Sequence, residues 1–258
     1  GLARMSIGLK TEERVALVTG GNRGIGLEVC RGLARQGYRV VMSGRDEANL
    51  RHAKVDLAAE GLKVDTIMLD VTDPNMVEIK HGANVDGNFI GDWIRRKYGR
   101  LDVLVNNAGV VPDETGHDEP VSIVDTARSA FELGFETHFY GPLAIIRGVL
   151  PMMREQNYGR IVNVSTGMAR LSSIQPGWPA YRATKVALNA LTALLGRELE
   201  GTNILVNAAS PGWVRTRMGG DNAELTPEQG ADTILWLATL EDGGPNGGFF
   251  ANREQTDW

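Results

Sequence analysis

The sequence predicts an α/β fold in which a doubly wound parallel sheet of about seven strands carries helices on both faces. Short apolar, β-branched runs alternate along the chain with amphipathic stretches of helical period, an order typical of a parallel sheet covered by helices. The chain has 258 residues, 42% of them hydrophobic, which is enough for one domain with a sizeable core. No internal repeat and no Pro/Ser-rich linker divides it. We therefore expect a single domain over residues 14–258, after a flexible N-terminal leader at 1–13.

Most of the expected strands end in glycine or polar residues. Ligands bind beyond the carboxyl ends of the strands in such sheets, so we expect the chemistry there. The expected strands are "RVALVTG" (14–20), "RVVMSG" (39–44), "KVDTIMLD" (63–70), "LDVLVNNAG" (101–109), "GRIVNVST" (159–166), "ILVNAASPG" (204–212) and "GGFFA" (247–251). The expected helices are 24–36, 46–60, 121–135, 137–156, 180–199 and 227–239.

One segment interrupts this order. The stretch "HGANVDGNFIGD" (81–92) has three glycines and two asparagines, which dilute a helical pattern between Val77 and Tyr98. It predicts a broken helix or a surface insertion, with a functional loop as the alternative.

Composition argues against several classes of partner. The net charge is −5, and no run of lysines and arginines is interleaved with aromatic residues, so no nucleic-acid partner is expected. No apolar run approaches the roughly 20 residues that span a bilayer, and we expect a cytoplasmic protein without a membrane partner. The single cysteine, Cys30, suits a reducing compartment and is expected to be buried. The histidines His52, His81 and His117 have no metal-like spacing and are expected at the surface; no metal is expected.

A glycine-rich turn follows the first expected strand. In "VALVTGGNRGIGLEV" the glycines stand where an apolar strand turns into a helix. Glycine permits unusual backbone angles and lets a pyrophosphate approach the backbone N–H groups, and the helix dipole adds attraction for the anion. Strand, glycines and helix in this order predict a dinucleotide-binding turn. Its candidate residues are Gly20, Asn22, Arg23, Gly24, Ile25 and Gly26.

The end of the second strand predicts which dinucleotide binds. NAD is usually held by a carboxylate about 20 residues after the glycines, but "VVMSGRD" has Gly44 at that position, followed by Arg45. A guanidinium pairs well with a 2′-phosphate, and Arg23 supplies a second cation. NADP(H) is therefore predicted over NAD(H), with Asp46 keeping NAD(H) as the alternative. Either arginine could instead be a solvated surface charge.

Four motifs in order resemble the short-chain dehydrogenase/reductase family: "TGGNRGIG" (19–26), "NNAG" (106–109), "YRATK" (181–185) and "PGWVRT" (211–216). The resemblance runs from about Arg14 to the C-terminus. The stretches "PGWVRTRMGG" and "GPNGGFFANREQTDW" are more specifically similar to its carbonyl-reductase branch. The resemblance implies a Rossmann-type fold and an NADP-dependent oxidoreductase that acts on carbonyl and alcohol groups.

Tyr181 and Lys185 are the central catalytic candidates. Their i, i+4 spacing puts them on one helix face. A tyrosine pKa of about 10 is too high for easy proton exchange, and we expect the nearby cation and the helix N-terminus to favour the phenolate. In the resembling family this tyrosine gives a proton to the substrate oxygen, and the lysine also holds the nicotinamide ribose.

Two further catalytic positions come from the resemblance. The family's hydroxyl beside the substrate oxygen aligns with Thr166, and Ser165 is kept as the alternative donor. The family's asparagine, which holds a water in a proton relay, is replaced by His138 in "ETHFYG". A histidine could bind that water and titrate near neutrality, and its positive charge would lower the lysine pKa. A relay role and a merely packed histidine both stay open.

The resemblance also implies the remaining cofactor contacts. Asp70 and Val71 should touch adenine, and "PGWVRT" should fix the nicotinamide carboxamide. Asn106 could alternatively bridge two strands. A mobile substrate lid is expected at about 216–228. The further cofactor candidates are Asn106, Ala108, Gly109, Pro211, Gly212, Val214 and Thr216, with Tyr181 and Lys185.

The sequence therefore predicts NADPH-dependent, reversible reduction of a ketone or aldehyde, with hydride from nicotinamide C4 and a proton from Tyr181. The alternative is an NADP(H)-binding sensor or scaffold with vestigial catalysis, which His138 and Thr166 favour. A halohydrin lyase would replace the glycine turn and the lysine, and both are present. Trp178 and Trp213 favour a bulky or aromatic small-molecule substrate, unless they only pack. The resemblance implies a homodimer or homotetramer through 121–156 and 180–199.

Overall fold

The computed structural model describes residues 14–77, 79–81, 84–87, 89–113 and 121–258. Eight strands form one sheet in the order β10-β9-β8-β7-β6-β1-β2-β3, and every neighbouring pair is parallel except β9 with β10. The predicted fold class, with about seven parallel strands, is confirmed. The strands are β1 (Val15–Val18), β2 (Arg39–Gly44), β3 (Val64–Met68), β6 (Val103–Asn106), β7 (Gly159–Val164), β8 (Ile204–Ser210), β9 (Phe249–Ala251) and β10 (Glu254–Thr256).

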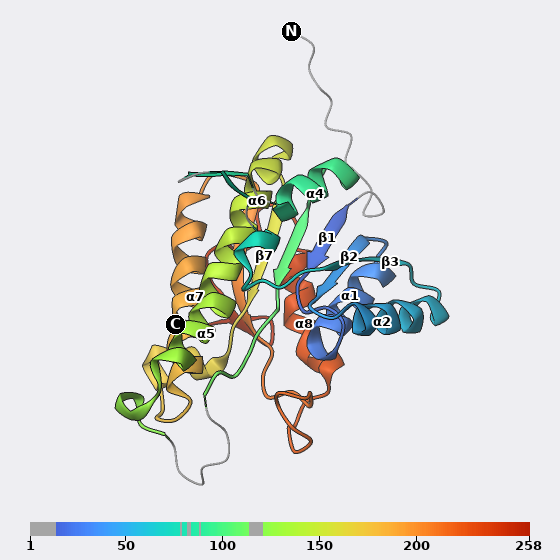
Figure 1. Ribbon diagram of the computed structural model, residues 1–258. Coiled ribbons are helices and arrows are strands. Elements are labelled where there is room, and N and C mark those ends of the chain that lie inside the picture. Colours follow the sequence, from blue (N-terminus) through green and yellow to red (C-terminus); the bar gives the residue numbers. More distant parts are fainter. Residues whose placement is uncertain (1–13, 78, 82–83, 88, 114–120) are drawn as a thin grey trace.

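Helices cover both faces of this sheet (Figure 1). They are α1 (Gly24–Arg35), α2 (Glu47–Ala59), α3 (Pro74–Val77), α4 (Phe89–Tyr98), α5 (Arg128–Phe135), α6 (Gly141–Gln156), α7 (Pro179–Glu198) and α8 (Pro227–Ala238). Within the described ranges, no helix is both long and apolar enough to cross a bilayer.

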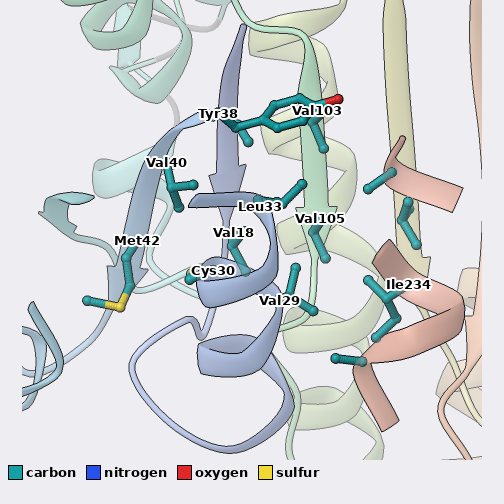
Figure 2. Close-up of a cluster of buried hydrophobic side chains, with 14 of the residues drawn as sticks. Val18, Val29, Cys30, Leu33, Tyr38, Val40, Met42, Val103, Val105 and Ile234 are labelled. Carbon is teal, nitrogen blue, oxygen red and sulfur yellow. The ribbon is translucent and has the colours of Figure 1, made fainter. Parts of the chain in front are cut away.

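The core lies in two apolar layers, one on each face. Alternate strand residues point to opposite faces, so Ala16 and Val18 of β1 join one cluster while Val15 and Leu17 join the other. The first cluster packs under α1, α2 and α8 and contains Cys30, which is buried as predicted. Figure 2 shows side chains of this cluster between the strands and α1. The second packs under α4, α6 and α7.

The structure differs from the predicted elements at three places. Within 81–92, a two-stranded antiparallel sheet of β4 (Ile79–His81) and β5 (Asn84–Gly87) precedes α4, so the helical pattern is indeed broken there. The helix predicted from 121 begins only at Arg128, because Ser122 caps a short 3-10 turn first. The strand β10 was missed because "EQT" has no apolar pattern.

Some sequence predictions concern residues that the structure does not describe. The leader 1–13 and His117 lie outside the described residues, as does the side chain of His81. His52 is exposed on α2, as predicted.

Helices α4 and α6 cross with their backbones almost touching. A Cβ built at Gly91 of α4 would lie 2.4 Å from the Gly148 carbonyl oxygen of α6. Real Cβ atoms do not approach backbone so closely, and neither helix can yield by rotating a side chain. Gly91 is therefore required by packing despite its low helix propensity.

We expect Gly91→Ala to lower the free energy of unfolding by about 1–3 kcal/mol, because overpacking outweighs the gain of about 1 kcal/mol in helix propensity. Urea denaturation measures the change. Arg96→Ala, at an exposed position of the same helix, is the control and should change stability by no more than about 0.5 kcal/mol. A Gly91→Ala protein as stable as the control would contradict the close crossing.

Candidate active site

The glycine turn between β1 and α1 is shaped to receive an anion. Gly20 and Gly24 have φ of +60° and +54°, a left-handed conformation that favours glycine. A Cβ at Gly26 would lie 2.2 Å from the Gly20 carbonyl oxygen, so this position also needs glycine. No side chain caps the N-terminus of α1, and its first turn has no acidic residue. Its N–H groups and the helix dipole can therefore act on a bound phosphate.

Two predicted cations flank this turn. Arg23 and Arg45 are both exposed, and within the described part of the chain neither forms an ion pair. The pKa of Arg23 is lowered by partial burial, then by the charges of Arg217 and of Arg45. Sequence reasoning missed Arg217. Its position directly after Thr216, the last residue of the "PGWVRT" motif, was the signal that could have identified it.

The segment that follows β6 is tied to the glycine turn. The Thr19 hydroxyl accepts hydrogen bonds from the backbone N–H groups of Asn107 and Ala108, both at 3.0 Å. The Asn107 side-chain amide donates to the Gly20 carbonyl at 3.1 Å. Two candidate cofactor-binding segments, far apart in sequence, therefore form one surface.

Asn106 and Asp70 have protein partners of their own. The Asn106 amide donates to Asn163 Oδ1 at 2.9 Å, so it does bridge β6 and β7, the alternative role considered for it; its own Oδ1 is buried without a protein partner. The Asp70 carboxylate accepts from the Thr72 N–H at 2.9 Å and from its hydroxyl at 2.7 Å. Val71, expected with Asp70 at the adenine, is buried.

Tyr181, Thr166 and Lys185 come together beyond the carboxyl end of β7. The Thr166 side chain lies close enough to the Tyr181 phenol to act on its pKa. Lys185 is buried, and its Nζ donates to the carbonyl of Val164, the last residue of β7, at 2.7 Å. The candidate acid–base groups therefore share one environment with the strand end.

Burial governs the protonation of this group. It raises the pKa of Tyr181, and the contact with Thr166 only partly offsets this. It also lowers the pKa of Lys185 to about 7. The expectation of a lowered Tyr181 pKa is wrong, because removing the phenol from water has the larger effect and the pKa is raised.

The two hydroxyl candidates differ in environment. Ser165 is buried, and its hydroxyl donates to Asn189 Oδ1 on α7 at 2.6 Å. Thr166 is only partly buried, accepts from the Met168 N–H at 3.2 Å and faces Tyr181. The geometry favours Thr166 as the hydroxyl that acts beside the phenol.

His138 lies in a π-helical turn (Glu136–Tyr140) between α5 and α6. Its Nε2 accepts from the Val110 N–H at 3.2 Å, so its Nδ1 carries the proton and donates to the Thr184 hydroxyl at 2.9 Å. That hydroxyl donates in turn to the Ala180 carbonyl at 2.7 Å. Both ring nitrogens therefore have protein partners.

The prediction that His138 titrates near neutrality is wrong. Burial, and after it the nearby charge of Lys185, lower the pKa of His138 to about 2. The ring also packs edge-on against Tyr181, with 5.8 Å between centroids. The arrangement supports the packed role for His138 over the relay role.

Asp113 is a site residue that sequence reasoning missed. Helix α7 starts at Pro179, and the residue before it, Trp178, has a φ of 44° and provides no side-chain cap. The buried Asp113 carboxylate caps the helix instead, accepting from the N–H groups of Ala180 at 2.9 Å and Tyr181 at 2.8 Å. These partners are 67 and 68 positions away, so no local pattern could have identified them.

The loop between β7 and α7 is held from two sides. Arg182 donates to the carbonyls of Gly177 at 2.7 Å and Met168 at 3.1 Å. The chain beyond β9 holds the other side, where Arg170 donates to Thr256 at 3.1 Å and the Ser172 N–H donates to the Trp258 carbonyl at 3.4 Å. This loop, which we call the pocket loop (residues 167–178), contains only short 3-10 turns.

The segment predicted as a lid (216–228) is a loop up to Thr226, and α8 begins at Pro227. Val214 and Leu225 form an isolated bridge across it. A Cβ at Gly24 would lie 3.2 Å from Thr216 Cγ2, so Thr216 rests on the glycine turn. The mobility of this lid stays a prediction.

Comparison with known proteins identifies the family. The family model described as short chain dehydrogenase matches residues 14–226. Carbonyl reductase (NADPH) 1 of Bos taurus is 34% identical over 95% of this chain and 98% of its own length. A solved short chain dehydrogenase/reductase family protein, 29% identical, superposes with a TM-score of 0.77 over 94% of this chain and 97% of its own. A metagenomic short-chain oxidoreductase solved with NADP, 26% identical, gives a TM-score of 0.76 over 94% and 98%.

The chain belongs to the short chain dehydrogenase family. The resemblance stated from the four motifs is therefore confirmed. Its more specific part, the likeness to carbonyl reductases, is confirmed by the bovine relative.

Lys185 should make stability depend on pH. Its pKa falls from 10.5 to about 7 on folding, so between these values the unfolded chain binds more protons and stability rises with pH. Relative to Lys185→Met, the wild-type free energy of unfolding should increase by about 2 kcal/mol from pH 7 to pH 9. Urea denaturation of both proteins without coenzyme measures this.

Lys54→Met, at an exposed position of α2, is the matched control, and its difference from wild type should stay constant over the same range. If the difference in unfolding free energy between Lys185→Met and wild type also stayed constant from pH 7 to pH 9, Lys185 would have to keep its proton in the folded protein. That result would contradict the lowered pKa.

Proposed function

We propose that this protein reduces a ketone or aldehyde to an alcohol with NADPH, reversibly. The observation that carries the proposal is the convergence of Tyr181, Thr166 and Lys185 beyond the end of β7, on the same edge of the sheet as the glycine turn. The name of the bovine relative, an NADPH carbonyl reductase, supports this choice of substrate class and coenzyme.

The described residues fit NADP(H). In the turn, Gly20 and Gly24 have positive φ, and a Cβ at Gly26 would clash. Because these residues have no Cβ, their backbone N–H groups are open to a pyrophosphate. Gly44 occupies the position where an NAD enzyme has a carboxylate. The Asn22 side chain packs against Gly44, since a Cβ built at Gly44 would lie 2.8 Å from Asn22 Oδ1. Arg23 and Arg45 would hold the 2′-phosphate. NADPH, when bound, supplies the hydride.

The chain's own residues would supply the proton and the orientation. The Tyr181 phenol, kept protonated by burial, donates its proton to the substrate oxygen as that oxygen gains charge. The Thr166 hydroxyl donates a second hydrogen bond to the same oxygen and positions it. In the reverse direction the phenolate takes the proton back.

Lys185 acts on the phenol from one helical turn away. With a pKa of about 7, it exchanges its proton near neutrality, and when charged it stabilises the phenolate that donation leaves behind. It is anchored by the Val164 carbonyl, and a Cβ built at Gly109, a candidate cofactor-binding residue, would lie 3.7 Å from its Nζ. We propose that its remaining protons also bind the nicotinamide ribose.

The substrate proposed is bulky and apolar or aromatic. Trp178, at the end of the pocket loop, is 48% exposed, and Trp213, three residues before the lid, is 55% exposed. Exposed tryptophans offer large apolar faces to a ligand. Exposed Leu133 on α5 and Leu194 on α7 support the proposed homo-oligomer through these helices.

A panel of ketones, aldehydes and diketones, run with NADPH and with NADH and followed by the loss of reduced-coenzyme absorbance, tests the function. We expect turnover with NADPH. Tyr181→Phe should lower kcat about 10²–10⁴-fold by removing the proton donor, while NADPH binding measured by fluorescence is kept. Coenzyme binding without turnover of any compound would favour the sensor or scaffold instead.

The same assay separates the two hydroxyls. Thr166→Val keeps the shape but removes the hydroxyl, and kcat should fall about 10²-fold or more, with Thr166→Ser restoring most of it. Ser165→Ala breaks the bond to Asn189 and should lower stability by about 1 kcal/mol with little change in kcat. The opposite order of kcat effects would make Ser165 the catalytic hydroxyl.

A further inference from the structure

The lid brings a third arginine to the cations of the glycine turn. Arg217 directly follows Thr216, whose methyl group rests on Gly24. The lid backbone is fixed here, because Thr216 Oγ1 accepts from the Gly219 N–H at 3.1 Å and the Thr216 carbonyl accepts from the Gly220 N–H at 2.9 Å. Arg217 is therefore held next to the turn by hydrogen bonds and packing, although its side chain is exposed.

Three arginines come from three segments that contact one another: a Cβ at Gly24 would lie 3.2 Å from Thr216 Cγ2, and a Cβ at Gly44 would lie 2.8 Å from Asn22 Oδ1. Arg23 comes from the turn, Arg45 from the residue after β2 and Arg217 from the lid, and the charges of the last two act on Arg23. Among the described residues, no carboxylate pairs with any of them. Like charges repel, so an unbalanced cluster is costly until a multiply charged anion binds.

The position of the cluster indicates which anion it suits. Arg45 follows the strand end where the adenosine ribose of a dinucleotide lies, and a phosphomonoester there carries about two negative charges near neutral pH. Guanidinium groups bind such phosphates by paired, charge-assisted hydrogen bonds. Three of them can engage one phosphate from different sides.

On the basis of the proposed function, we propose that Arg217 is a coenzyme-binding residue that completes, with Arg23 and Arg45, a three-arginine site for the 2′-phosphate of NADP(H). The lid then contributes to the choice between the two coenzymes as well as covering the site. The 2′-phosphate, in turn, holds the lid against the glycine turn.

Direct binding of NADPH and NADH, measured by fluorescence titration without substrate, tests this. Arg217→Ala should raise the NADPH dissociation constant about 10-fold, the effect of losing one charge-assisted hydrogen bond, and should leave the NADH dissociation constant within twofold. Raising the salt concentration should weaken NADPH binding less steeply in the variant than in wild type.

Arg215→Ala is the matched control, because Arg215 is an exposed arginine only two residues before Arg217, and its charge is not among those acting on Arg23. It should leave both dissociation constants within twofold. Equal weakening of NADPH and NADH by Arg217→Ala would overturn the 2′-phosphate assignment, and so would no weakening of either. A wild-type protein that bound neither coenzyme would overturn the proposed function as well.

Discussion

The docking of the first turns of α7 onto the strand ends is the constraint on which the site depends. A helix N-terminus buried against a sheet needs partners for its free N–H groups, and Asp113 supplies them next to Tyr181. One turn on, the Thr184 hydroxyl accepts a hydrogen bond from His138 Nδ1, and Lys185 donates to the Val164 carbonyl. With Arg182, which donates to the Met168 carbonyl, three of the four residues after Tyr181 are anchored to other segments.

The family resemblance implies two departures from the family pattern, one at His138 and one at Thr166. His138 replaces an asparagine but remains neutral, because both ring nitrogens are used and burial opposes a second proton. It therefore places no second positive charge beside Lys185. Thr166 keeps the hydroxyl of the serine it replaces, and its methyl group restricts the rotamers available to it.

The sequence predicted what is set by local pattern. Alternating apolar runs gave the parallel sheet, and the glycines before α1 gave the turn, because each depends on a few neighbouring residues. Asp113 and Arg217 were missed since their partners lie far along the chain, and a lone acidic or basic residue has no pattern of its own. The direction of the Tyr181 pKa shift was also missed, because charge spacing can be read from sequence whereas depth of burial cannot.

The bracing of the pocket loop by the last residues of the chain has a consequence for how substrate range can change. Residues 167–178 have little regular structure, so their shape depends on Arg182 on one side and on Thr256 and Trp258 on the other. The groups proposed to transfer the proton, by contrast, are anchored to β7 and to the segment after β6. Altering the β9–β10 hairpin could therefore remodel the entrance for a new carbonyl compound while the chemistry behind it stays intact.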